Sequence, residues 1–400
     1  MSERIKALSR EIGNDIISLR HELHKFPEGS HNETKTADIL AEKFGKLPCI
    51  LIKGVAGTGL VADLTVDGAN RTVAIRADMD ALPVSEANDV PYKSQNKGFM
   101  HACGHDAHMS IAYGAARILS HLQEELNVNV RVIFQPAEES SSIDSLLGNK
   151  LIGGAKPIID KGYLDNVDYI IGLHVNPNLK AGYFGVKSGI FGAAKATFIL
   201  ELIGNSSHGS RPQAGKDAIT CAAHMISALQ TMISRETDPM IPIVLNILEI
   251  KSDEFRGEII PSYVKMRGSI KVFADIDMEE LGNKIREKAR YITSAFGLDF
   301  RLNYAVGTPA IVNDPTVSAC GKEAATKILG DNRVVEASLE LGSDDVARYF
   351  KKTKGAYFLL GTGSDEYNQE LHTSKFNLDD KLIPLASAIM AQTVIELQNL

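Results

Sequence analysis

Apolar residues are spaced in two different ways along this chain of 400 residues. In residues 1–45 they recur every three or four positions, starting at Ile5 and Leu8, and this spacing predicts helices. Farther along, apolar runs of strand length alternate with helical stretches. We expect strands at 59–66, 72–80, 129–136 and 169–175, with a helix at 107–125. Alternation of strand and helix predicts a mostly parallel sheet covered by helices.

The order of elements changes between residues 187 and 304. The pattern there predicts, in order, a strand at 196–204, a helix at 216–235, strands at 241–250 and 263–273, a helix at 277–295 and a strand at 299–304. This order is that of a ferredoxin-like α+β unit. A buried strand at 355–363 and a helix at 379–399 then resume the first pattern. We therefore expect an α/β domain at 1–186 and 305–400, interrupted by a ferredoxin-like domain at 187–304.

Composition and charge are those of an ordinary globular protein, with 44% apolar and 23% charged residues. The net charge of −7 leaves no basic surface for nucleic acid and would be repelled by an anionic membrane, so neither partner is expected. The charged N-terminus lacks the apolar core of a secretory signal, and no window is long and apolar enough for a transmembrane helix. Four cysteines without regular spacing fit a reducing cytoplasm better than a disulfide framework.

The densest chemical signal is the segment 100–108, with three histidines, one cysteine and one aspartate. Cys103 and His105 lie two residues apart before a predicted helix. Alternate side chains of an extended segment share a face, so both can reach one metal ion. Gly104 between them permits an unusual turn. A buried cysteine beside surface histidines is the alternative, and the density of the cluster disfavours it.

Two carboxylates directly follow the apolar strand at 129–136. Open α/β sheets place their sites at the carboxyl ends of parallel strands, which makes Glu138 and Glu139 candidates. Neighbouring residues point in different directions, so one can bind a metal ion while the other faces the substrate as a general base. The alternative is a solvated acidic pair in a loop.

Other candidates are weak when taken singly. His174 ends a predicted strand, where a half-buried histidine is the alternative, and His372 lies in a polar loop, where a surface histidine is ordinary. Asp78 and Asp80 occupy alternate positions at the end of another predicted strand. Both can point towards a site there, although a polar turn also explains them.

Together these residues follow a recognisable order. The chain reads D-x-D-A-L-P, H-x-C-G-H-D-x-H, Q-P-A-E-E, G-x-H and a late H-T. This order resembles peptidase family M20, a di-metal family that contains the aminoacylases and glutamate carboxypeptidases. In detail it resembles the amidohydrolase branch, with its N-acyl amino acid, hippurate and auxin-conjugate hydrolases. The resemblance extends over essentially the whole chain, including the segment 204–212 of the insertion.

The resemblance implies a homodimer with two divalent metal ions per subunit. Cys103 takes the position of a ligand that bridges the two ions. The remaining ligand positions fall on His105, Glu139, His174 and His372. A thiolate and imidazoles favour Zn²⁺ or Mn²⁺, with Ni²⁺ and Co²⁺ as alternatives, over Mg²⁺ or Ca²⁺.

The resemblance also implies catalytic roles. Glu138 matches the general base, and Asp80 matches the acidic residue that orients the metal site. Asp78 stands where other branches carry a ligand histidine. His208 matches a histidine that the inserted domain offers to the scissile carbonyl, often across a dimer interface, where it would bind the developing oxyanion.

The chain departs from the family in the pocket expected to hold the carboxylate of the released amino acid. Glu258 replaces an asparagine, and Lys271 replaces an arginine. A glutamate facing a substrate carboxylate would repel it. Either Arg256 or Arg211 compensates, or the leaving group is not a plain amino acid.

The leading hypothesis is a cytoplasmic, aminoacylase-like metal-dependent amidohydrolase that acts on N-acyl amino acids. A metallo-carboxypeptidase or dipeptidase with the same centre is the nearest alternative. A catalytically silent metal- or ligand-binding relative is another, against which the intact Glu138 argues. A redox protein using Cys103 is disfavoured because no other cysteine lies near it in the sequence.

Overall fold

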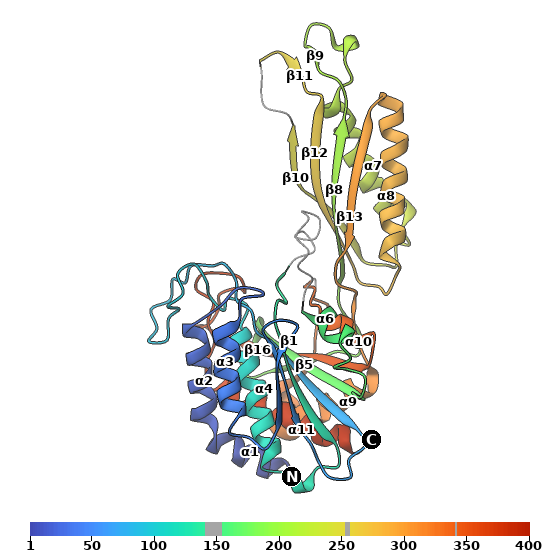
Figure 1. Cartoon of the computed structure of the whole chain (residues 1–400). Coiled ribbons are helices and arrows are strands. Elements are labelled where there is room, and N and C mark those ends of the chain that lie inside the picture. Colours follow the sequence, from blue (N-terminus) through green and yellow to red (C-terminus); the bar gives the residue numbers. More distant parts are fainter. Residues whose placement is uncertain (141–153, 253–256, 341) are drawn as a thin grey trace.

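The computed structural model describes residues 1–140, 154–252, 257–340 and 342–400. Within these residues the chain forms two parts: an eight-stranded sheet covered by helices, and a four-stranded sheet with two long helices (Figure 1). The smaller part extends from one end of the larger part as an elongated arm (Figure 1). The predicted α/β class with an inserted α+β unit is confirmed.

The larger sheet is parallel at its centre. Its strands, in spatial order, are β1 (Ile50–Val55), β2 (Gly59–Leu64), β4 (Asn129–Gln135), β3 (Thr72–Asp78), β5 (Tyr169–Lys180), β16 (Lys354–Gly363), β6 (Phe184–Val186) and β15 (Val334–Glu336). Neighbours pair in parallel from β4 through β3 and β5 to β16, whereas β1, β2 and β4 pair antiparallel. The carboxyl ends of β3, β4 and β5 therefore meet at one edge, where open α/β sheets place their sites.

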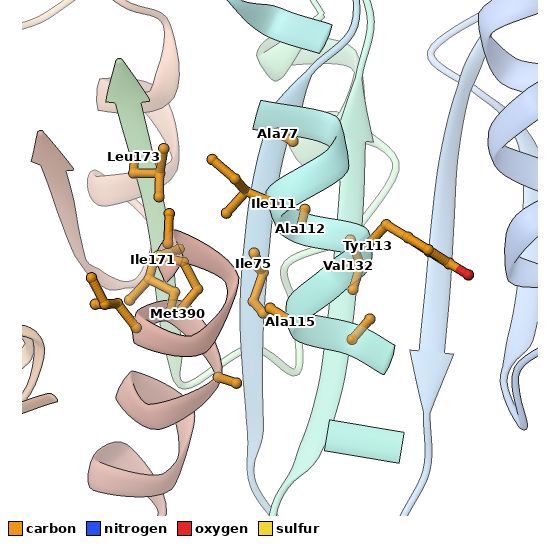
Figure 2. Close-up of a cluster of buried hydrophobic side chains, with 14 of the residues drawn as sticks. Ile75, Ala77, Ile111, Ala112, Tyr113, Ala115, Val132, Ile171, Leu173 and Met390 are labelled. Atoms are coloured by element: carbon orange, nitrogen blue, oxygen red, sulfur yellow. The ribbon is translucent and has the colours of Figure 1, made fainter. Parts of the chain in front are cut away.

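Helices cover both faces of this sheet. One face carries α1 (Ser2–Glu11), α2 (Gly13–Lys25), α3 (Thr34–Phe44), α4 (His105–Ser120), α9 (Pro315–Leu329) and α11 (Leu382–Gln398), and the other carries α6 (Ala155–Asp160) and α10 (Val346–Phe350). Figure 2 shows Ile111 of α4 and Met390 of α11 against Ile75 of β3 and Ile171 of β5. The neighbouring Ala74 belongs to the core on the opposite face, as expected for strands buried on both sides. Among the described residues, no helix is long and apolar enough to cross a membrane.

The smaller part has the element order of a ferredoxin-like unit. It comprises β8 (Ala194–Ile203), α7 (Ala218–Glu236), β10 (Ile243–Ser252), β12 (Tyr263–Val272), α8 (Met278–Phe296) and β13 (Asp299–Val306). The spatial order is β10-β12-β8-β13, and every pair is antiparallel. The carboxylates of Asp217 and Asp277 accept backbone N–H groups in the first turns of α7 and α8, which fixes where both helices begin. Helix α8 ends at Gly297, whose φ of +68° suits glycine.

Short strand pairs mark the two ends of the smaller part. Strands β7 (Gly189–Gly192) and β14 (Ile311–Asn313) pair where the chain leaves and re-enters the larger part. At the far end of the arm, β9 (Ser207–His208) pairs with β11 (Ile259–Ile260) (Figure 1). The expected domain limits at 187 and 304 stay a prediction, and β13 itself continues to residue 306.

Candidate metal centre

The side chains expected to bind metal come from four separate segments of the larger part. Cys103 and His105 lie at the start of α4, Glu139 follows β4, His174 lies in β5, and His372 lies in the loop after β16. Their ligand atoms form two groups, and within each group all three atoms lie within 4.8 Å of one another. The groups are Cys103 with His105 and His174, and Cys103 with Glu139 and His372. Cys103 belongs to both, as a ligand between two ions would.

Contacts of Cys103 join the two groups. Its Sγ lies 3.4 Å from Nε2 of His174 and 3.3 Å from Nε2 of His372. The same Nε2 of His372 lies 3.4 Å from Oε1 of Glu139. Thiol, imidazole and carboxylate atoms at these separations can converge on ions placed between them.

Gly104 shapes the turn that carries Cys103 and His105. Its φ is +83°, in the left-handed region that favours glycine. A Cβ atom at this position would lie 2.5 Å from Cγ2 of Val175 on β5. The turn and the close approach to β5 therefore both require glycine.

Two histidines are fixed by hydrogen bonds to backbone carbonyls. Nδ1 of His105 lies 2.7 Å from the carbonyl oxygen of Asp80, and Nδ1 of His174 lies 2.7 Å from that of Val175. A carbonyl oxygen only accepts, so each Nδ1 donates, and in the neutral ring Nε2 keeps its lone pair. Metal-binding histidines are commonly oriented in this way.

Buried atoms without partners fit the presence of cations. Nε2 of His105 and Oε1 of Glu139 are buried and have no hydrogen-bond partner among the described residues. Such atoms are costly to bury unless something engages them. Divalent ions at the two groups would engage both atoms, so the residues present fit a two-metal centre.

The pKa shifts of the clustered side chains also fit bound cations. Burial, together with the carboxylates of Asp344 and Glu139, raises the pKa of Glu138 well above its usual value. Burial raises the pKa of the Cys103 thiol well above its usual range. Burial lowers the pKa of His174 to about 3, so this ring is neutral at pH 7 and available as a ligand. Bound cations would favour the thiolate and the carboxylates.

Asp80 holds the loop that carries both glutamates. Its Oδ1 accepts the backbone N–H of Glu138 at 3.1 Å, and its Oδ2 accepts that of Glu139 at 2.9 Å. The hydroxyl of Ser30 donates to Oδ2 at 2.6 Å. Asp80 is 1% exposed, so these bonds form out of contact with bulk water. It positions the glutamates through the backbone.

Asp78 contacts residues that support the ligand cluster. Its Oδ1 is 2.7 Å from Nδ1 of His108, and its Oδ2 is 2.7 Å from Nη1 of Arg76. Nε2 of His108 in turn accepts the backbone N–H of Val175. The contacts of Asp78 thus brace strand β5 beside His174.

A cavity of about 440 Å³ opens in front of the cluster. Glu138, Cys103 and His174 line it, and so do residues of both parts that sequence patterns did not single out. The added lining residues with charged side chains are Lys195 of the smaller part and Glu340, Asp344 and Glu370 of the larger part. Lys271, already noted in the sequence, also lines the cavity. This volume suits a small molecule. Nothing in the local sequence marks Lys195 or Glu340, because the cavity arises only when the two parts are brought together.

The structure does not bring every candidate to this cavity. His208 and Glu258 lie on or beside the β9–β11 pair at the far end of the arm, and Arg211 follows in the same loop (Figure 1). The side chains of all three are exposed, and none lines the cavity. Arg256 falls outside the described residues.

Known proteins resemble this chain over most of its length. The sequence model of the family described as peptidase family M20/M25/M40 matches residues 74–396. Thermostable carboxypeptidase 1 of Saccharolobus solfataricus is 32% identical over 402 residues, covering 99% of this chain and 99% of that protein. N-acetyl-L-cysteine deacetylase of Bacillus subtilis is 31% identical over 388 residues, covering 94% of this chain and 87% of that protein.

A solved structure extends the likeness to the fold. The crystal structure of the Bacillus subtilis YXEP protein, described as a dinuclear metal-binding peptidase of the M20 family, matches with a TM-score of 0.82 and 28% identity. The match covers 98% of this chain and 99% of that chain. The family model matches most of the chain and the fold matches a solved member, so the chain belongs to peptidase family M20/M25/M40.

Proposed function

We propose that this family member is a metal-dependent amidohydrolase that cleaves the amide bond of N-acyl amino acids or related small N-acyl compounds. The observation that carries the proposal is that Cys103 is common to two groups of ligand atoms, with Glu138 on the wall of the same cavity. The name of the N-acetyl-L-cysteine deacetylase relative supports the class of substrate.

The ligand set suits borderline metal ions. One thiolate, three imidazoles and one carboxylate favour Zn²⁺ or Mn²⁺, with Ni²⁺ and Co²⁺ as alternatives. When bound, two such ions would polarise the amide carbonyl and lower the pKa of water. A reducing cytoplasm belongs to the proposal because Cys103 must remain a thiol, and all four cysteines are free in the structure.

Glu138 is the general base in this proposal. Its carboxylate takes a proton from the attacking water as the new C–O bond forms. It returns that proton to the nitrogen as the C–N bond breaks, so the carboxylate is regenerated when amine and acid leave. Burial and Asp344 raise the pKa of Glu138, which makes its carboxylate a stronger base than that of an exposed glutamate.

We assign His208 to the active site of a second copy. Strand β9 lies at the end of the arm away from the cavity of its own chain (Figure 1). Among the described residues β10 pairs on one side only, with β12, and Val244, Leu248 and Ile250 on it are exposed. Pairing of two β10 strands across a two-fold axis would cover both exposed strand edges. In that dimer His208 would donate to the carbonyl oxygen as negative charge develops there.

A metallo-carboxypeptidase is the second candidate function. The relative named thermostable carboxypeptidase 1 covers 99% of this chain, and this specific likeness favours it. Both functions use the same centre and differ in what lies on the acyl side of the cleaved bond.

A substrate comparison on metal-loaded protein tests the proposal. We expect kcat/KM for N-acetyl and N-benzoyl amino acids to exceed that for dipeptides and longer peptides by more than tenfold. Equal or greater turnover of peptides would favour the carboxypeptidase. Protein that binds two ions per chain yet cleaves none of these amides would refute both.

A further inference from the structure

Three consecutive backbone N–H groups in the loop after β4 donate to buried carboxylates. Those of Glu138 and Glu139 donate to Asp80. The N–H of Ala137, one residue earlier, donates instead to Oε1 of Glu33 at 2.8 Å. Glu33 directly precedes α3 and is fully buried. The loop that carries the general base is therefore held by two acidic residues, of which the sequence patterns singled out only Asp80.

Ala137 has an uncommon backbone conformation. Its φ is +56°, in the left-handed region that residues other than glycine rarely adopt. His31, whose φ is +67°, donates its backbone N–H to the same Oε1 of Glu33 at 3.0 Å. Conformations of this kind cost free energy and persist only where the surrounding structure enforces them. One carboxylate oxygen of Glu33 supplies an enforcing contact to both residues.

The Glu33 side chain contributes acceptor oxygens rather than charge. Its Oε2 accepts the hydroxyl hydrogen of Thr58 at 2.5 Å. Within the described part of the chain, no cationic side chain forms an ion pair with it. Burial and the nearby carboxylate of Asp80 raise the pKa of Glu33. A negative charge is unfavourable at this position, so the hydrogen bonds are what the position requires.

The segment before α3 is itself joined to the strand end that carries Asp80. The N–H of Ala81 donates to the carbonyl oxygen of Glu28 at 2.8 Å. The hydroxyl of Ser30 donates to the Asp80 carboxylate. These contacts fix the place of Glu33 relative to Asp80, so that both can hold the same loop.

We propose that Glu33 is a positioning residue for the general base: it holds the backbone of Ala137 so that the Glu138 side chain lies on the cavity wall. This inference rests on the proposed function, because it concerns the base of the same reaction. Glu33 does not line the cavity, and it acts through the hydrogen bond to Ala137. Loss of that bond frees Ala137 to leave the left-handed region, which turns Glu138 away from the attacking water. Glu139 stays held by Asp80, so the metal ions should remain bound.

Two variants separate reach from charge. Glu33→Asp keeps the carboxylate but is one methylene shorter, so it cannot reach Ala137. Glu33→Gln keeps the reach, because its amide oxygen can replace Oε1 while the hydroxyl oxygen of Thr58 accepts from its NH₂ group. We expect kcat of the metal-loaded enzyme on an N-acyl amino acid to fall by about 10–100-fold in Glu33→Asp, with KM and bound metal unchanged. Glu33→Gln should keep kcat within about twofold of the wild type.

Thr58→Val is the matched control. It removes the other hydrogen bond to Glu33 and leaves the bond to Ala137 in place. It should lower the urea midpoint of unfolding and leave kcat unchanged. A merely structural role of Glu33 would give the same pattern in Glu33→Asp, that is, lower stability with an unchanged kcat of the folded enzyme.

Three kinetic results would overturn the inference. They are a wild-type kcat in folded Glu33→Asp, an equal loss in Glu33→Gln, which would assign the effect to charge, and an equal loss in Thr58→Val, which would assign it to general loosening of the segment before α3.

Hydrogen exchange at the Ala137 amide, read by mass spectrometry on zinc-loaded protein, tests the same bond without turnover. The amide should be protected in the wild type, Glu33→Gln and Thr58→Val, and it should exchange faster in Glu33→Asp. An unprotected Ala137 amide in the wild type, or unchanged exchange in Glu33→Asp, would overturn the inference. Wild-type protein that binds two ions yet cleaves no amide would refute the hydrolase, and the exchange rates would still decide whether Glu33 holds this loop.

Discussion

Replacing Asp80 by asparagine tests whether this buried carboxylate positions both glutamates. Its two oxygens accept the backbone N–H groups of Glu138 and Glu139, at 3.1 and 2.9 Å. Asparagine offers only one acceptor oxygen, so one of these N–H groups would face an NH₂ group. A buried donor without an acceptor costs about 1–3 kcal/mol. We expect Asp80→Asn to lower the free energy of unfolding by that amount.

The same change should act on metal binding and turnover. Loss of a residue that orients metal ligands typically costs about 10–100-fold in metal affinity or activity. We would measure unfolding of metal-free protein in urea, metal affinity by competition with a chelator, and kcat on an N-acyl amino acid. Ser30→Ala is the matched control, because it removes one hydrogen bond to the same carboxylate and leaves both backbone bonds in place. It should cost about 0.5–1.5 kcal/mol and change metal affinity little. If Asp80→Asn loses stability but keeps its metal affinity and kcat, the positioning role is wrong.

Other expected outcomes follow from the same centre. Cys103→Ser should lower metal content and activity together while circular dichroism stays native, and unchanged metal stoichiometry would exclude Cys103 as a ligand. Glu138→Gln should lose about 10²–10⁴ in kcat and keep its metals, whereas Glu139→Gln should lose metal; the reverse behaviour would exchange the two roles. Burial raises the pKa of both Cys103 and Glu139, so protons compete with metal ions for these side chains as the pH falls. Metal affinity should therefore drop from pH 8 to pH 6, and an affinity that does not change with pH would contradict this. Co-refolded His208→Ala and Glu138→Gln chains should regain activity through heterodimers that hold one intact site, and a mixture that stays inactive despite proven heterodimers would exclude a role for His208 across the interface.

The sequence predicted the main elements because both spacings of apolar residues are set by burial. Strands β3, β4 and β5 are largely buried because helices cover both faces of their sheet. Their sequences are therefore nearly continuous apolar runs, which can be recognised without the structure. The ferredoxin-like order was also readable, since one face of that sheet packs on α7 and α8. The short strands β6, β7, β14 and β15 were missed. They contain only three or four residues each, too few for a period to emerge, and tertiary pairing creates them.

The candidate ligands were found because they cluster in the sequence or end predicted strands. His372 and Cys103, far apart in the chain, were joined only through the family resemblance, and the structure places Sγ of Cys103 3.3 Å from Nε2 of His372. Lys195 could not be found in this way. A single lysine in an alternating strand reads as a solvent-facing position, and only the register of β8 against β12 places it opposite Lys271.

Metal content measured together with activity shows whether the ligand cluster holds the catalytic ions. The protein would be stripped with a chelator, reloaded with Zn²⁺ or Mn²⁺, and assayed for hydrolysis of N-acyl amino acids while bound metal is counted by atomic spectroscopy. We expect about two ions per chain at full occupancy, with hydrolysis absent from the stripped protein and restored as the ions return. Hydrolysis that persists in fully stripped protein, or reloaded protein that binds no metal at neutral pH, would contradict it.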